Sequence, residues 1–402
     1  ARNVLNKLSE SFGLAVDPDM IVENLPVGLQ QRVEILKALF RGAEILILDE
    51  PTGVLTPQET EQLFDILRAL REQGVTILLI THKLKEIMAI TDDVSVMRDG
   101  EMVAHLKTAQ TSPAELAELM VGRKVLLEVD HTPAKPGVPV LQAENLCLTT
   151  ANGIDHLKDI SLTLREGEIV GVAGVSGNGQ SELLDVLSGI TTPTSGSFRV
   201  GTNEITTQRP SDPAQLRRLG VAHVPEDRHK CGIILPFSAA ESMILGYSGT
   251  DEQNQGWWLS PSALEQNCAD RMHGFDIRPP LPSLASANFS GGNQQKIVLA
   301  REISTQPKLL LVGQPTRGVD IGAIEFIHKQ LIALRNEGCA ILLVSVELDE
   351  IMSLSDRILV MNNGQMVGEL AREEADEQQL GLMMAGIGAE DGITTSQMRA
   401  GS

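Results

Sequence analysis

One long sequence pattern occurs twice in this chain. Glycines and prolines recur at a constant offset of 264 residues (292 minus 28), as Gly28 and Gly292, Pro51 and Pro315, and Gly100 and Gly364. The stretch LQQRVEILKALFRGAEILILDEPTGVLTPQE in the first third corresponds to NQQKIVLAREISTQPKLLLVGQPTRGVDIGA in the last third. Such self-similarity indicates two copies of one domain, and 402 residues are too many for a single ordinary core.

The repeat also predicts the domain boundaries. The second copy is whole and occupies residues 140–385, whereas residues 1–122 hold only the C-terminal part of the first copy. Subtracting the offset from Leu141 places the start of the first copy about 120 residues before residue 1, so we expect an N-terminally truncated first domain. Residues 123–139 contain three prolines and fit an exposed linker. Residues 386–402, rich in Gly, Ser and Thr, are predicted to form a flexible tail.

Helix and strand patterns alternate within each copy. Apolar residues at helical spacing run from Leu29 to Phe40. Residues 45–48 then form an all-apolar run, as expected for a strand in a sheet that is covered on both faces. A helix at roughly residues 59–73 and a strand at residues 75–80 follow. This order predicts an α/β fold with a mainly parallel sheet.

The charge and the apolar content of the sequence argue against some classes of binding partner. The net charge of −20 argues against nucleic acid, because nucleic-acid binders present a strongly basic face. The longest apolar runs cover five or six residues. A membrane-spanning helix needs about 20, so any link to a membrane is expected to go through a partner protein. The cysteines at positions 147, 231, 268 and 339 are widely spaced, which favours buried reduced thiols over a disulfide or a zinc site.

A glycine-rich turn follows the strand predicted at residues 169–172. It fits the phosphate-loop pattern G-x-x-x-x-G-K-[ST] except at its seventh position, where glutamine replaces lysine: Gly174, Val175, Ser176, Gly177, Asn178, Gly179, Gln180 and Ser181. The glycines let backbone N–H groups point at phosphate oxygens, and Ser181 keeps a hydroxyl for Mg²⁺. Taken alone, a turn without the lysine is equally well explained as a structural strand–helix connection.

Two further motifs follow in the second copy. A helix opens with bare N–H groups and a hydroxyl, which suit an incoming phosphate, at Ser290, Gly291, Gly292, Asn293 and Gln294. An apolar strand then ends at Val312. The order and spacing of phosphate loop, SGGNQ signature, Walker B strand and switch segment resemble the ABC ATPases over nearly the whole chain. The resemblance implies a P-loop NTPase fold of the ABC type with a helical subdomain, two copies in tandem, and ATP and Mg²⁺ as cofactors.

The resemblance further implies that the two domains pair within the molecule and enclose two nucleotides. Site one would join the ILILDE strand of the first copy to the SGGNQ signature of the second. Asp49 would hold Mg²⁺ through water, Glu50 would take a proton from the attacking water, and His82 would contact the γ-phosphate. The alternatives are a helix cap, a solvated acid and ordinary packing. The phosphate loop of site one would belong to the missing front, so this chain alone is expected to hydrolyse ATP poorly.

Site two would join the machinery of the second copy to the signature of the first, and it departs from the family pattern at every motif. Gln180 removes a positive charge from the phosphates, and the amide of Gln314 cannot take a proton. The other departures are Gly313 for the Mg²⁺-binding aspartate, Glu347 for the switch histidine, and Pro26 and Val27 in the partner signature. The resemblance therefore implies one hydrolytic site and one degenerate binding site.

The SGGNQQK signature, the tandem arrangement and the degenerate second site are similar to importers of simple sugars and nucleosides. The resemblance implies an ATPase that lies peripherally at the cytoplasmic face of the membrane. It would bind integral permease subunits, work indirectly with an extracytoplasmic substrate-binding protein, and bind no nucleic acid. The alternatives are a soluble tandem ABC factor that acts on ribosomes, a DNA-repair protein and an inactive regulator. Whether the cargo is a nucleoside or a monosaccharide stays open.

Three other features carry weaker expectations. VPEDRHKCG, residues 224–232, resembles the Q-loop region with Glu226 where glutamine is usual. By this resemblance it would help form the groove for a membrane-subunit helix, and a solvated loop is the alternative. Trp257 and Trp258 are expected to pack in the helical subdomain rather than stack on adenine. His156 is a candidate for adenine stacking.

Overall fold

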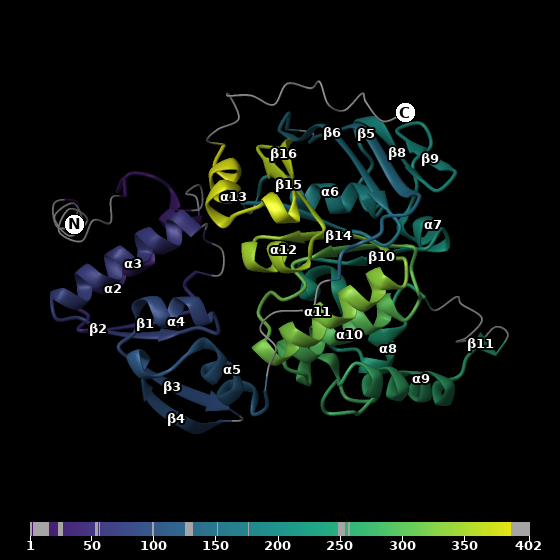
Figure 1. Cartoon of the computed structure of the whole chain (residues 1–402). Helices are drawn as coiled ribbons and strands as arrows, with labels where there is room; N and C mark the ends of the chain where they lie inside the picture. The colour runs from purple at the N-terminus through teal and green to yellow at the C-terminus, as the bar shows by residue number, and fades with distance from the viewer. Residues whose placement is uncertain are drawn as a thin grey trace. The chain divides into compact units, whose positions relative to one another are not determined.

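The computed structural model of the chain describes residues 2, 16–22, 27–52, 55, 57–98, 100–124, 132–150, 152–175, 177–247, 254–255 and 258–386. The chain divides into two compact units, residues 1–127 and residues 128–402, which we call the first unit and the second unit. Figure 1 draws the first unit in purple to blue and the second in blue-green to yellow.

A six-stranded sheet forms the centre of the second unit. Its order is β10, β13, β14, β7, β15 and β16, and every neighbouring pair is parallel except β15 with β16. The strands are β7 (Ile169–Gly174), β10 (Val221–Val224), β13 (Leu309–Gly313), β14 (Ala340–Ser345), β15 (Arg357–Asn362) and β16 (Gln365–Ala371). All residues of β7, β13 and β14 are buried, which explains why these strands are apolar along their whole length.

A second, antiparallel sheet covers one face of the central sheet. Its order is β6, β5, β8 and β9, with bounds β5 (Pro139–Thr149), β6 (Asp155–Arg165), β8 (Ser195–Val200) and β9 (Asn203–Thr206). Helix α6 (Gln180–Leu187) contributes to the same core. Leu141, Leu164, Leu184 and Leu311 belong to this one cluster and are almost completely buried. The core therefore holds the start of α6, where the phosphate loop ends, against both sheets.

Helices cover the other face of the central sheet and extend beyond it. The helices whose side chains enter the second core cluster are α10 (Gly291–Ile303), α11 (Ile321–Asn336), α12 (Leu348–Leu354) and α13 (Glu377–Met384). A separate cluster joins α8 (Ala239–Met243) and α9 (Pro261–Gly274) to α10 and includes Phe289. This cluster is the predicted helical subdomain. The remaining described elements of this unit are α7 (Pro213–Arg218), a π-helical turn (Arg228–Gly232), two 3₁₀ turns (Ser286–Asn288 and Arg372–Glu374), β11 (Asn254–Gln255) and β12 (Trp258–Leu259).

The first unit contains two small sheets. Strands β1 (Ile45–Asp49) and β2 (Thr76–Ile80) pair in parallel, and β3 (Asp93–Arg98) and β4 (Glu101–Lys107) pair antiparallel. The helices are α2 (Val27–Phe40), α3 (Pro57–Glu72), α4 (Leu84–Ile90) and α5 (Pro113–Val121). Residues of α2 and α3 pack with Leu46 of β1 in one core cluster, and both helices lie on one side of the β1–β2 pair in Figure 1. The predicted helices and strands of this region are confirmed to within two residues.

The elements of the first unit recur in the second unit at the offset of the sequence repeat. Adding 264 to the bounds of β1, α4, β3 and β4 yields the bounds of β13, α12, β15 and β16. Helix α5 corresponds to α13 with a difference of one residue at its end. The repeated sequence therefore forms the same succession of helices and strands twice.

The prediction that strand 45–48 is covered on both faces is wrong. Ile45 and Ile47 are 64% and 62% exposed, whereas Leu46 between them is 4% exposed. Leu309 and Leu311, at the same places in β13, are 0% exposed because the antiparallel sheet and α6 cover them. The described part of the first unit has no such layer on that face. An apolar run thus indicates that a strand can be buried on both sides, while the neighbouring elements decide whether it is.

The four cysteines are free thiols. Cys268 and Cys339 are buried, and this burial raises the pKa of each thiol to about 12. Cys147 is partly exposed and Cys231 is exposed. The prediction that the thiols are buried is therefore wrong for Cys231, which belongs to the π-helical turn.

Candidate functional site: two nucleotide-site halves

The phosphate loop of the second unit connects β7 to α6. Gly177 and Gly179 have φ of 89° and 104°, a backbone conformation that glycine adopts without strain. A Cβ on Gly179 would lie 2.5 Å from the carbonyl oxygen of His156, so only glycine fits there. The N–H of Asn178 donates to the carbonyl of Val175 at 3.1 Å, which closes the turn. The turn leads into the N-terminus of α6, where free N–H groups favour a phosphate. Ser176 lies outside the described residues.

Gln180 takes the place of the phosphate-loop lysine, and its amide bonds back to the loop. Its Nε2 donates to the carbonyl of Val175 at 3.1 Å, and the residue is 4% exposed. A Cβ on Gly174 would lie 2.1 Å from this Nε2, so the glycine makes room for the amide. Gln180 therefore stabilises the curl of the loop and brings no charge to it.

Ser181 and Glu226 meet at the end of the loop. The Ser181 hydroxyl donates to Oε2 of Glu226 at 2.5 Å. Burial raises the pKa of Glu226; the bond from Ser181 lowers it, and the neighbouring charge of Glu182 raises it. Glu226 thus lies against the phosphate loop, a contact that neither expectation for residues 224–232, a membrane-subunit groove or a solvated loop, included.

His156 lies near the loop but is engaged with an acid. Its Nδ1 is 3.2 Å from Oε1 of Glu182, and both side chains are about seven-tenths buried. The carbonyl of His156 faces Gly179 and Gly364. Its predicted stacking on adenine stays a prediction. Trp257 and the side chain of Trp258 lie outside the described residues.

At the end of β13 the second unit carries an amide in place of the expected acid. Gln314 has φ of 48°, and its N–H donates to the carbonyl of Val344 at 2.8 Å. Its Oε1 accepts from the N–H of Val346 at 3.3 Å, and the residue is 8% exposed. The amide is therefore buried against the chain that follows β14. The prediction that Glu347 replaces the switch histidine is wrong, because the residue at the offset of 264 from His82 is Val346. Glu347 corresponds to Lys83, and these two residues are the N-caps of α12 and α4.

The SGGNQ signature forms the start of α10. Ser290 is the N-cap, and its hydroxyl accepts from the N–H and the side-chain amide of Asn293 at 3.4 and 2.9 Å. A Cβ on Gly291 would lie 3.0 Å from the carbonyl of Gly318, so the backbone approaches closely there. Gly292 and Gln294 are buried. Gln294 donates to the carbonyl of Ser286 at 3.0 Å and contacts His229 Nε2 at 2.8 Å. Its side chain ties the signature helix to the loop of residues 224–232.

The first unit has an acid and a histidine where the second has Gln314 and Val346. Asp49 ends β1 opposite Ile80 of β2 and is exposed. Glu50 has φ of 44°, and its N–H donates to the carbonyl of Ile80 at 2.8 Å. The Oε1 of Glu50 lies 2.7 Å from Nδ1 of His82, and the two side chains are 45% and 21% exposed. The structure therefore brings the predicted catalytic pair, Glu50 and His82, into direct contact.

A buried acid that the sequence analysis missed supports this pair. Glu86 is 6% exposed and accepts hydrogen bonds from the hydroxyls of Thr52 and Thr81, the latter at 3.1 Å. Thr81 in turn accepts from the N–H of Lys83 at 3.0 Å. Glu86 thus joins the segments that follow β1 and β2, on which Glu50 and His82 lie. Its recurrence as Glu350 in the sequence repeat was the signal that could have revealed it.

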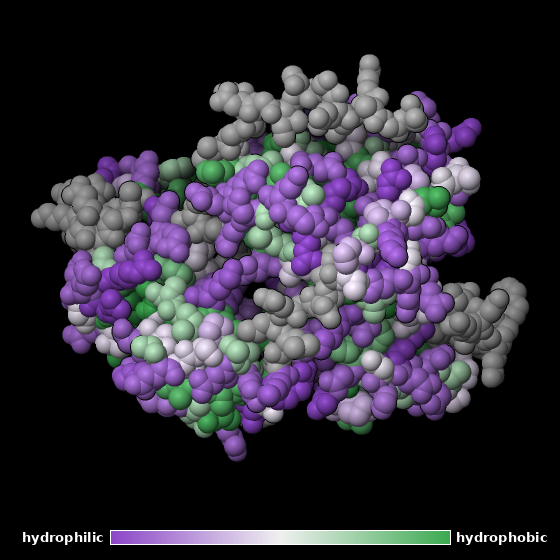
Figure 2. All heavy atoms as spheres, in the orientation of Figure 1, coloured by the Kyte–Doolittle hydropathy of each residue, from purple (hydrophilic) through white to green (hydrophobic). Residues whose placement is uncertain are grey.

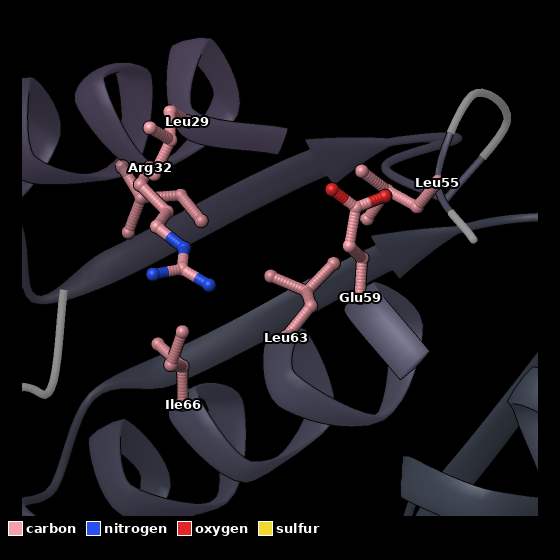
Figure 3. A pocket seen from close by; sticks show the side chains of 7 residues that line it. Leu29, Arg32, Leu55, Glu59, Leu63 and Ile66 are labelled. Carbon is pink, nitrogen blue, oxygen red and sulfur yellow. The ribbon is translucent and has the colours of Figure 1, made fainter. Parts of the chain in front are cut away.

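The described pocket of the first unit is a separate feature. Figure 3 shows its lining side chains, which come from α2, α3 and the loop before α3: Leu29, Arg32, Ile35, Leu55, Glu59, Leu63 and Ile66. The guanidinium of Arg32 donates to Gln62 at 2.6 Å. None of the predicted nucleotide-site residues lines this pocket.

The chain is similar to known ATP-binding proteins over nearly its whole length. The ABC transporter family pattern matches residues 157–317. The nucleoside import ATP-binding protein of Lactococcus lactis is 44% identical over 96% of this chain and 76% of its own length. The glucose import ATP-binding protein of Haloferax volcanii is 44% identical over 98% and 72%, and the guanosine import ATP-binding protein of Bacillus subtilis is 43% identical over 94% and 74%.

The chain belongs to the ATP-binding subunits of ABC importers of the nucleoside and sugar type. The predicted enzyme class, an ATPase, is confirmed, and the alternative of a factor that acts on ribosomes finds no support among these relatives. A nucleotide-free ATP-binding cassette superposes with a TM-score of 0.52 at 20% identity, over 64% of this chain and 100% of that one. At this identity the match shows the fold alone, which is that of the ABC ATPases.

Within the ranges that the structure describes, none of the helices combines the length and the apolar character that a membrane crossing requires. Hydrophilic residues cover most of the face seen in Figure 2, with apolar residues in small groups.

Proposed function

We propose that this importer subunit contains two ABC domains that pair within the molecule, and that ATP is hydrolysed only at the site built on the first unit. The observation that carries the proposal is the 2.7 Å contact between Glu50 and His82. Gln314 and Val346 occupy the same places in the second unit. An ATP-binding cassette described in a dimeric state with ADP and phosphate offers a precedent for pairing.

The first site has a group that can act as a general base. Glu50 is 45% exposed at the end of β1, so its carboxylate is accessible to water. A carboxylate general base contributes about 10²–10⁴ in rate. His82 holds one oxygen of this carboxylate, which leaves the other free to accept a proton. By the resemblance to the family, the opposite wall of this site would be the signature Ser290, Gly291, Gly292, Asn293 and Gln294.

The second site keeps a phosphate cradle without the means of hydrolysis. Its loop, Gly174 to Ser181, retains the positive-φ glycines and the start of a helix. Gln314 cannot accept a proton, and its amide oxygen already accepts from Val346. A nucleotide bound there would be retained without turnover, which would stabilise the closed pair of domains.

Mg²⁺ fits both sites by donor chemistry. It prefers oxygen ligands and usually shares them with substrate phosphates. Asp49 in the first unit and the Ser181 hydroxyl in the second are such donors. No group of three or more His, Cys, Asp or Glu side chains among the described residues could hold a metal ion without help. When bound, Mg²⁺ would neutralise phosphate charge.

The partners follow from the family. We propose that the subunit lies peripherally at the cytoplasmic face of the membrane and binds two integral permease subunits, which receive cargo from an extracytoplasmic binding protein. Ile234, Leu235 and Phe237 are 37–39% exposed just after the loop of residues 224–232, and they provide an apolar surface for a permease helix. Relatives named for nucleoside, guanosine, glucose and ribose import make a nucleoside or a simple sugar the proposed cargo.

Paired substitutions in the assembled importer test the two sites. Glu50→Gln should lower cargo-dependent ATP hydrolysis by about 10²–10⁴, because it removes the base. Gln314→Glu, the matched change in the second unit, should leave hydrolysis near the parent rate. Hydrolysis that survives Glu50→Gln, or that Gln314→Glu restores in the Glu50→Gln background, would contradict the assignment.

A further inference from the structure

The guanidinium group of Arg228 lies beside the first glycine of the SGGNQ signature. Arg228 begins the π-helical turn that comes after β10. A Cβ placed on Gly291 would lie 2.7 Å from Nη2 of Arg228, and a Cβ on Gly318 would lie 3.8 Å from the same atom. Gly291 therefore leaves room for the guanidinium, which lies between the signature and the segment that follows β13.

One edge of this guanidinium has no protein partner. Its Nη1 donates to the carbonyl of Arg317 at 2.9 Å. Nε is buried and has no hydrogen-bond partner among the described residues, and Nη2 has none there either. Nε and Nη2 share one edge of the planar group, which can donate two parallel hydrogen bonds to a carboxylate or a phosphate. Because an unpaired buried donor is unfavourable, this edge is suited to the oxygens of a ligand.

The charges around Arg228 favour an anion. The charged groups that act on it are Asp227 and Arg317. Asp227 caps the turn, since its Oδ1 accepts from the N–H groups of His229 and Lys230 at 2.9 and 3.0 Å. Arg317 adds a second positive charge, and the N-terminus of α10 adds the partial positive charge of a helix start. An anion at the free edge of Arg228 would therefore be stabilised by all of these groups except Asp227.

We propose that the Nε–Nη2 edge of Arg228 binds the terminal phosphate of the nucleotide held by the first unit, next to the N–H groups of the signature. This rests on the proposed function, in which the signature forms the opposite wall of the first site. ADP lacks the terminal phosphate, so Arg228 distinguishes ATP from ADP at the site that hydrolyses ATP.

Substitution of Arg228 in the assembled importer tests the inference. Arg228→Gln keeps an N–H group that can donate to the carbonyl of Arg317, but it loses the charge and the two-donor edge. A hydrogen bond to a charged group contributes about 10–100-fold in affinity, so kcat/KM for ATP should fall by about that factor. Inhibition of hydrolysis by ADP should be unchanged. Arg228→Lys keeps the charge and should lose less than Arg228→Gln.

Arg278→Gln is the matched control. Arg278 also lies at the signature, because its backbone N–H donates to Oδ1 of Asn293 at 2.9 Å. Its guanidinium already binds Asp276 at 2.8 Å, and its side chain is 76% exposed. Removal of this charge should leave kcat/KM near the parent value. A fall as large as that of Arg228→Gln would overturn the inference, because any positive charge near the signature would then have the same effect.

Three further results would overturn it in variants that assemble and melt like the parent. The first is a parent-like kcat/KM for Arg228→Gln, or for Arg228→Met if the glutamine variant does not assemble. The second is an equal loss for Arg228→Gln and Arg228→Lys, which would indicate that the residue only positions the signature. The third is ADP inhibition that weakens as much as the use of ATP. Hydrolysis that survives Glu50→Gln would instead contradict the proposed function of the first site, which is a separate result.

Discussion

The two units place different side chains on the same backbone. Glu50 and Gln314 have φ of 44° and 48°, and the N–H of each donates at 2.8 Å to the carbonyl of the adjacent strand. Residues other than glycine rarely adopt positive φ, and such conformations are common at functional sites. The second unit therefore has the same backbone conformation with an amide in place of the acid. The comparison teaches that the chemical character of this position can differ while its backbone stays the same.

The side-chain oxygens of Glu50 and Gln314 also have different hydrogen-bond partners. Glu50 is directed to His82, whereas Gln314 is directed to the N–H of Val346 and is 8% exposed. Restoring an acid at position 314 would place a charge on a buried group that has a neutral partner. A single substitution there should therefore not recreate the first site, because its surroundings have changed with it.

After Glu50→Gln, the substitution with the largest expected effect on ATP hydrolysis is that of His82, which contacts Glu50. His82→Gln removes the ring that holds the carboxylate and that is predicted to contact the γ-phosphate. Loss of one such stabilising group costs roughly 10²–10³ in kcat. In the assembled importer we expect a fall of this size in kcat with a smaller change in KM, measured by steady-state ATP hydrolysis.

Val346→Gln is the matched change in the second unit, because Val346 lies at the offset of 264 from His82, and it should leave kcat near the parent value. A fall in kcat with Val346→Gln as large as that with His82→Gln would break the comparison, since both switch positions would then serve the chemistry.

The stability of the second unit should depend on pH through one buried histidine, His223. His223 lies on β10, and burial lowers its pKa to about 4, with Glu302 raising it and Arg217 and Arg301 lowering it. The folded state therefore binds this proton less readily than the unfolded state. Stability should be full above about pH 6.5 and should fall by up to about 3 kcal/mol as the pH decreases toward 4.

Both tryptophans, at positions 257 and 258, belong to the second unit, so urea unfolding followed by their fluorescence measures this effect. The control His223→Gln should flatten the pH dependence between 6.5 and 4. A parent transition that does not move over this range would contradict the assignment to His223.

The smallest expected difference concerns the repeated acids Glu86 and Glu350. Glu86 accepts from two threonine hydroxyls, whereas Glu350 faces His328 at 3.2 Å and its Oε2 has no hydrogen-bond partner in the described part of the chain. Glu86→Gln should cost about 1–3 kcal/mol, because one hydroxyl would face an amide NH₂ group.

Glu350→Gln should cost less, since its amide can occupy the place of the unpaired oxygen. Hydrogen exchange at the amides of β2 and β14 compares the two variants within their own units. Equal acceleration in both would argue that the two buried acids have the same role.

Sequence reasoning succeeded where the property is local and repeated. Element positions such as Pro57–Glu72 and Thr76–Ile80 follow from periodicity, and the loop at Gly174 follows from the spacing of glycines. It failed for the burial of Ile45 and Ile47, because burial depends on a layer that the strand itself does not encode. Glu86 was not predicted as a site residue, because a single acid in a helix has no distinguishing pattern. Glu226 was noted for its place in the Q-loop resemblance, but its contact with Ser181 joins residues 45 positions apart and could not be predicted.

The amino-acid order alone established the family, the repeat, and which of the two strand ends carries an acid, since these depend on residue identity and spacing. Folding in three dimensions added the contacts between residues far apart in the chain. It brought Glu50 to His82 across 32 positions and Ser181 to Glu226 across 45, and it filled the side-chain space of Gly313 with a glutamate from the loop after another strand. Such pairings depend on which strands become neighbours in a sheet, and strand order is a property of the assembled core.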